Sequence, residues 1–145
     1  MAANQYPIFP NVLHNGGGTI TTADATASKN HDGTSTSVVL LYTAGSNGSR
    51  IDDVKAYPLG TNVASVLRIF INNGSANTTA ANNTLEFEAA LPAITISEIN
   101  AQTEVVLRQP NDNRPLNLPA GYKLYGIVGT TVAAGWNVSV KGGDY

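Results

Sequence analysis

The chain has 145 residues, only 12% of them charged, and a formal net charge of −2 at pH 7. This length predicts a single domain that buries its own core, and the lack of cysteine excludes disulfide bonds and thiolate metal sites. The weak charge provides no basic patch for nucleic acid, and the apolar runs are shorter than the roughly 20 residues that a membrane helix needs.

Two prolines interrupt the apolar N-terminal stretch, which therefore predicts an extended arm and not a central strand. It also lacks the basic and apolar regions of a signal peptide. We place the arm at residues 1–17 and a β-sandwich domain at residues 18–145, with a flexible break at Asn15–Gly18. The arm either folds back onto its own domain or reaches a neighbouring subunit, and both interpretations stay open. The arm residues expected to contact a partner are Tyr6, Pro7, Ile8, Phe9 and Pro10.

Short strand-like segments separated by turn signals follow the arm. Ser37–Thr43 is apolar on both faces, which is typical of a strand in a sandwich core or of a strand covered by a partner. The next segment, Arg50–Tyr57, alternates imperfectly between apolar and polar residues. Ile51 and Val54 cannot both point inward at a period of two, so we expect a β-bulge or a twist near Asp52–Asp53.

Val63–Leu91 is the clearest β-hairpin in the sequence, with two strands joined by the polar loop Asn72–Thr84. The residues expected on its core face are Val63, Leu67, Ile69, Ile71, Leu85 and Phe87. The other face mixes apolar residues with an arginine and two glutamates, which is typical of a semi-buried interface. An Arg–Glu pair across the strands would help to fix the register. The residues expected at a subunit interface are Val66, Arg68, Phe70, Glu86 and Glu88.

The last two predicted strands are Tyr122–Val128 and Trp136–Lys141. In the second, Trp136, Val138 and Val140 alternate with polar residues, which predicts one buried face and one face toward water. Eight or nine short strands with frequent turn signals predict an all-β fold. We expect a single-domain antiparallel β-sandwich, jelly-roll-like, with an extended N-terminal arm.

No group of residues in the sequence predicts catalysis or cofactor binding. His14 and His31 lie in loops rich in Gly and Asn, without a second ligand at metal-binding spacing, and we expect both at the loop surface. The adjacent carboxylates of Asp52 and Asp53 point to opposite faces of a strand, so they cannot converge as a glycosidase pair does. A nucleophile elbow is missing from the sequence. We therefore expect neither an enzyme nor a metal or cofactor site.

Five segments, in order along the chain, resemble a group of small phage virion proteins. These proteins are capsid decoration (cement) proteins or related head and tail structural proteins. The matching segments are Thr43–Gly45, Gly48–Ile51, Arg68–Ile71, Leu118–Gly121 and Gly135–Val138. The resemblance spans about Thr19 to the C-terminus. It implies a jelly-roll-like domain, often trimeric, that binds a capsid lattice, and it supplies no catalytic residues.

The low charge, the apolar strands and the resemblance together predict a non-enzymatic virion structural protein. We expect a homotrimer that binds the major capsid protein and stabilises the capsid by bridging capsomers. It would be made in the host cytoplasm and lie on the capsid surface of the virion, without nucleic acid or membrane as partner. The alternative is a carbohydrate- or host-surface-binding module of a phage tail. Its candidate sugar-stacking residues are Tyr57, Tyr122, Tyr125 and Trp136.

Overall fold

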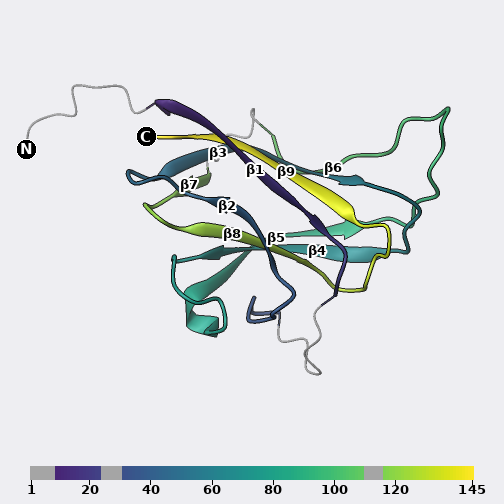
Figure 1. The fold of residues 1–145 in the computed structure, drawn as a ribbon, viewed down its shortest axis with the longest axis horizontal. Helices are drawn as coiled ribbons and strands as arrows, with labels where there is room; N and C mark the ends of the chain where they lie inside the picture. The colour runs from purple at the N-terminus through teal and green to yellow at the C-terminus, as the bar shows by residue number, and fades with distance from the viewer. Residues whose placement is uncertain (1–8, 24–30, 110–115) are drawn as a thin grey trace, which may run out of the picture.

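The described part of the chain folds into β-strands joined by loops and one short 3-10 turn (Figure 1). The computed structural model describes residues 9–23, 31–109 and 116–145. The first sheet contains β1 (Val12–Ile20), β3 (Ser49–Pro58), β6 (Val105–Arg108), β7 (Leu116–Leu118) and β9 (Trp136–Asp144). The second sheet contains β2 (Val39–Thr43), β4 (Ser65–Asn72), β5 (Asn83–Leu91) and β8 (Lys123–Val128). The turn η1 (Ala80–Asn82) lies in the loop between β4 and β5.

The two sheets are antiparallel and pack face to face, so the predicted all-β sandwich is confirmed. The first sheet has the strand order β1-β9-β3-β6, with β7 also paired to β3. The second has the order β2-β8-β4-β5. The core lies between them, because alternate side chains of each strand point toward the opposite sheet. Trp136, Val138 and Val140 of β9 are completely buried there, as the alternation predicted.

The irregular strand β3 contains the predicted bulge. Ile51 and Val54 are both fully buried, and the register between β3 and β9 shifts between Ile51 and Asp53. The extra residue resets the alternation, so two apolar residues at an odd spacing reach the same core.

The glycine-rich segment near the N-terminus is part of a strand, so the prediction of a flexible break at Asn15–Gly18 is wrong. β1 pairs with β9 from Val12 to Ile20, which places residues 12–17 in the sheet and not in an arm. A Cβ atom on Gly16 would lie 2.2 Å from the carbonyl oxygen of Leu41 in β2. The glycines therefore let an edge strand of one sheet approach an edge strand of the other closely.

Two residues expected on the core face of the β4–β5 hairpin are exposed instead. Val63 precedes β4, which begins at Ser65. A bulge in the pairing between Ile69 and Phe70 places Leu85 opposite Phe70, on the outer face of the sheet. Strict alternation along β5 could not reveal this bulge, because its position depends on how the two strands pair.

Candidate functional site

Arg68 and Glu88 form the predicted pair on the outer face of the β4–β5 hairpin. They lie opposite each other in the register, and Arg68 Nη2 donates to Glu88 Oε1 at 3.2 Å. The arginine side chain is only 11% exposed, whereas the glutamate side chain is 50% exposed. Because water screens the glutamate, this pair contributes about 0.2–1 kcal/mol to stability. Its geometric effect is to hold the guanidinium group against the sheet.

Phe70 is on the same face but is covered by its own chain, with 1% exposure. A Cβ atom on Gly33 would lie 3.1 Å from the phenyl ring, so the loop around Gly33 passes directly over it. Asn77 Nδ2 fixes this loop by donating to the carbonyl oxygens of Gly33 at 3.2 Å and Ser35 at 3.1 Å. Phe70 is therefore absent from the accessible part of the predicted interface, which retains Val66 and Glu86.

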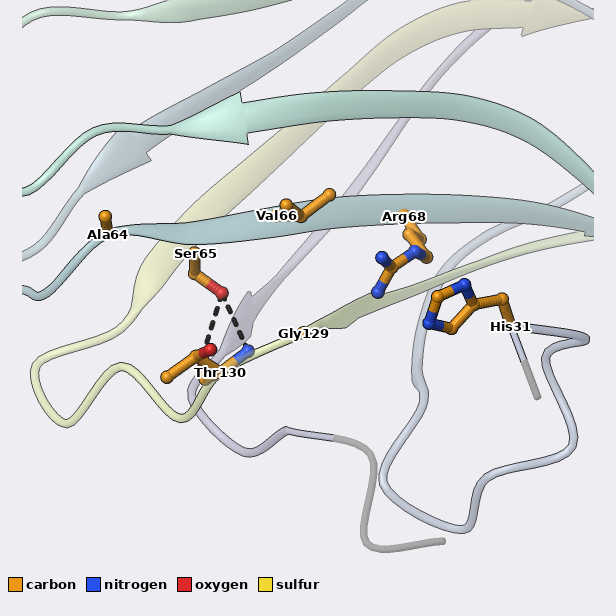
Figure 2. Close-up of a pocket in the computed structure, with 7 residues that line it drawn as sticks. All are labelled: His31, Ala64, Ser65, Val66, Arg68, Gly129 and Thr130. Carbon is orange, nitrogen blue, oxygen red and sulfur yellow. Dashed lines mark hydrogen bonds between the residues drawn. The ribbon is translucent and has the colours of Figure 1, made fainter. Parts of the chain in front are cut away.

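A pocket of about 390 Å³ lies beside Arg68, on the outer face of the second sheet (Figure 2). It is formed by the start of β4, the residues after β8, and the loop that leads into β2. The described residues that line it are His31, Ala64, Ser65, Val66, Arg68, Gly129 and Thr130. The structure thus brings Val66 and Arg68 of the predicted interface together with residues from two other segments.

Hydrogen bonds fix the wall of the pocket. Ser65 Oγ accepts from the backbone N–H of Thr130 at 2.9 Å and donates to the carbonyl oxygen of Thr130 at 2.9 Å. The N–H of Gly129 donates to the carbonyl oxygen of Val66 at 2.8 Å. The segment after β8 is therefore held rigidly along the start of β4.

The Arg68 guanidinium lies at this wall and has N–H donors that Glu88 does not use. A Cβ atom on Gly129 would lie 3.1 Å from Arg68 Nη1, so the glycine leaves room for the guanidinium. Arg68 Nε is buried and has no partner among the described residues. A guanidinium carries five N–H donors, and Glu88 takes only one of them in the described part of the chain.

His31 faces the same pocket from a left-handed backbone conformation, with φ at 53°. It is exposed, as predicted. Its proximity to Arg68 was missed because the two residues are distant in sequence and no motif joins them. Thr130 was missed for the same reason.

A second polar cluster is centred on the Asp144 carboxylate, at the end of β9. Ser49 Oγ donates to it at 2.5 Å, Tyr42 OH donates to it at 3.2 Å, and His14 Nδ1 lies 3.0 Å from it. The His14 and Tyr42 rings also pack together, with centroids 4.4 Å apart. His14 is therefore in strand β1, and its predicted place in a surface loop is wrong. The cluster joins β1, β2, β3 and β9 across both sheets.

The surroundings of this cluster shift two pKa values. Partial burial acts to raise the pKa of the Asp144 carboxyl. Hydrogen bonds from Ser49 and His14 outweigh burial and hold that pKa below its ordinary value. Burial raises the pKa of Tyr42 to about 12. Ser49 donates to Asp144 and not to His14, so the cluster lacks the nucleophile–base pair of a triad and serves to connect strands.

Of the predicted arm contacts, Tyr6, Pro7 and Ile8 lie outside the described residues. Phe9 is exposed and Pro10 is partly buried. Just after them the N–H of Asn11 donates to the carbonyl oxygen of Asp144 at 2.7 Å, which ties the base of the arm to β9. The apolar side chains of Val12 and Leu13 are exposed on β1, Leu13 by 90%.

The aromatic residues considered for sugar stacking are differently placed. Trp136 is completely buried in the core, and Tyr122 and Tyr125 are partly buried. Tyr57 is exposed, but its hydroxyl donates to Glu104 Oε2 at 2.5 Å. These residues form no exposed aromatic platform.

The described residues contain neither a cluster of metal ligands nor a membrane-spanning helix. Within residues 9–23, 31–109 and 116–145, no three His, Asp or Glu side chains are grouped to hold a metal ion. The same residues contain no helix long and apolar enough to cross a membrane.

Comparisons of the chain with protein-family models, curated proteins and solved structures found no match. Its function is therefore inferred from its own residues.

Proposed function

We propose that the chain is a non-enzymatic virion structural protein that binds a capsid lattice as a trimer and stabilises it. The observation that carries this proposal is a group of three exposed apolar residues close together in sequence, Phe9, Val12 and Leu13, where the arm meets β1. Hydrogen bonds to β9 hold the backbone from Asn11 onward, which includes Val12 and Leu13. Apolar side chains on an ordered backbone lose little conformational entropy on binding, so they are suited to contact another protein.

A second group of exposed apolar residues supports a molecule with two contact surfaces. Leu59, Ile96 and Ile99 are exposed, Ile99 by 91%. Ile94, between β5 and β6, is tied to the body because its backbone exchanges two hydrogen bonds of 2.9 Å with Asn62. The segment between β5 and β6 extends beyond the sheets, at the opposite end of the long axis from the start of β1 (Figure 1). One surface would contact sister subunits and the other the capsid lattice.

The path of the chain between the sheets also supports the proposal. β1, β3, β6 and β9 share one sheet, while β2, β4, β5 and β8 share the other. The chain therefore crosses between the sheets repeatedly, as in a jelly roll built from two Greek keys. Jelly rolls are a common architecture of viral capsid proteins, in agreement with the five sequence segments that resemble virion proteins.

A sugar-binding module of a phage tail has less support. Of its four stacking candidates, Trp136 is completely buried, Tyr122 and Tyr125 are partly buried, and only Tyr57 is exposed. Stacking on a sugar needs an accessible aromatic face.

The proposal is tested on the full chain by light scattering and by cosedimentation with empty capsids assembled from the major capsid protein of the same genome. We expect a trimer at micromolar concentration that sediments with capsids. The double variant Phe9→Ser, Leu13→Ser should fold but lose capsid binding. Leu40→Ser, which removes an exposed leucine from β2, is the matched control and should still bind. A monomer that does not sediment with capsids would overturn the proposal.

A further inference from the structure

We propose that the pocket beside Arg68 binds an oxyanion, a carboxylate or phosphate group, through Arg68, His31 and Thr130. This inference goes beyond the proposed function and does not rest on it, because binding is measurable on the isolated chain. The pocket holds about 390 Å³, which is ample for a group of this size.

The first support is the incomplete pairing of Arg68. A guanidinium taken largely out of water needs partners for its charge and its N–H groups. Here Glu88 contacts only Nη2, at 3.2 Å, and Nε is unpartnered within the described part of the chain. An oxyanion at this wall would add the bidentate contacts for which the planar guanidinium is suited.

The second support comes from two further residues that line the pocket, His31 and Thr130. His31 is the only non-glycine residue with a positive φ in the described ranges, a conformation that costs free energy and tends to occur at functional positions. This conformation directs the imidazole toward the side of the pocket where the guanidinium lies (Figure 2). Thr130 lines the pocket as well, and two hydrogen bonds to Ser65 fix its backbone there.

The third support is the sign of the charge. Arg68 is charged, the His31 ring can donate a hydrogen bond, and none of the described residues that line the pocket is acidic. Glu88 lies outside the lining and competes for the same guanidinium. The pocket therefore favours a ligand with negative charge and acceptor oxygens over a cation or a neutral apolar molecule.

The test is a titration of the isotopically labelled full chain, followed by the NMR shifts of its backbone amides at constant ionic strength. Three probes are used: sodium phosphate, sodium acetate and a short capped peptide with one glutamate. We expect saturable shifts at Gly129, Thr130 and His31 with at least one probe. Binding of a small anion would indicate a free ligand, whereas binding of the peptide alone would indicate an acidic side chain of a partner protein. Either result supports the proposal, and the absence of shifts with all three overturns it.

Variants assign the binding to these residues. Arg68→Gln should weaken binding at least about tenfold, and His31→Asn, which tolerates the same backbone conformation, should weaken it less. Arg50→Gln is the matched control, because Arg50 is also ion-paired to a carboxylate on the surface, Asp52, but lies outside the pocket. Equal losses in Arg68→Gln and Arg50→Gln would overturn the proposal.

Glu88→Gln keeps the test decisive if Arg68→Gln does not fold. This change removes the competing carboxylate and leaves Arg68 in place, so binding should become several-fold tighter. Unchanged or weaker binding in Glu88→Gln would contradict a role for the guanidinium.

Discussion

The Asp144 carboxylate and the Arg68 guanidinium are both partly buried charged groups, but they differ in how completely the fold pairs them. Side chains from three other strands surround Asp144, namely Ser49, His14 and Tyr42. Among the described residues, Arg68 has one carboxylate partner, on the adjacent strand, and it lies beside a pocket. The first arrangement satisfies a charge with groups of the same chain, and the second leaves capacity for a ligand.

This difference separates a structural cluster from a candidate binding site. The Asp144 cluster connects the edge strands β1 and β2 with the central strands β3 and β9, next to the close approach at Gly16. Changes there should affect folding stability. Changes at the Arg68 pocket should affect stability little and ligand binding more.

The largest effect on folding stability is expected for Gly16→Val, which disrupts the close approach of β1 to β2. Its Cβ would lie 2.2 Å from the carbonyl oxygen of Leu41, a backbone atom that cannot move aside without displacing β2. Overpacking of this kind costs about 1–3 kcal/mol, and we expect the upper end. Urea unfolding measures the loss. Asn15→Val, at the exposed neighbouring position of the same strand, should stay close to wild type, and equal midpoints for the two variants would contradict the close approach.

Asp144→Ala should have the next largest effect. It leaves the donors of Ser49 and Tyr42 without their acceptor, at a cost of about 1–3 kcal/mol in the free energy of unfolding. Asp52→Ala is the matched control, because Asp52 forms an exposed pair with Arg50 and should cost about 0–1 kcal/mol. If both variants lost the same stability in urea unfolding, the cluster would be no more important than a surface ion pair.

A smaller effect is expected from acid. The pKa of Asp144 is lower in the folded chain than its ordinary value of 3.8, so the folded state favours the ionised carboxylate. Its contribution to stability is fully present above pH 3.8 and is lost as the pH falls through the lower, folded pKa. The stability difference between wild type and Asp144→Ala should therefore shrink in this acid range. Parallel stability curves for the two proteins, measured by urea unfolding at several pH values, would contradict this assignment.

The features predicted correctly from the sequence are those specified by neighbouring residues. The bulge in β3 was predictable because Ile51 and Val54 are both apolar at an odd spacing. The Arg68–Glu88 pair was predictable because a hairpin fixes which residues face each other. In both features the physical signal lies within one strand or one hairpin.

The features that were missed depend on contacts between distant segments. In the sequence, the glycines of β1 resemble a linker. The reason for them is the close approach of Gly16 to Leu41 of the opposite sheet, which only the structure shows. Phe70 alternates onto an outer face, and only the position of the Gly33 loop shows that it is covered. The pocket needs His31 and Thr130 from two further segments, and no periodicity within β4 indicates which loops will lie over its outer face.

The smallest expected effect on stability is that of Glu88→Ala, which removes the carboxylate partner of Arg68. The glutamate side chain is half exposed, so water screens the pair and the loss should be about 0.2–1 kcal/mol. High salt should reduce the loss further, because salt screens an exposed pair. Glu86→Ala removes an exposed glutamate of the same strand and is the control. Urea unfolding at low and high salt checks both variants. A loss of stability as large as that of Asp144→Ala, and independent of salt, would contradict this comparison. It would mean that Glu88 is as important for folding as Asp144, and that the pocket is part of the folding core.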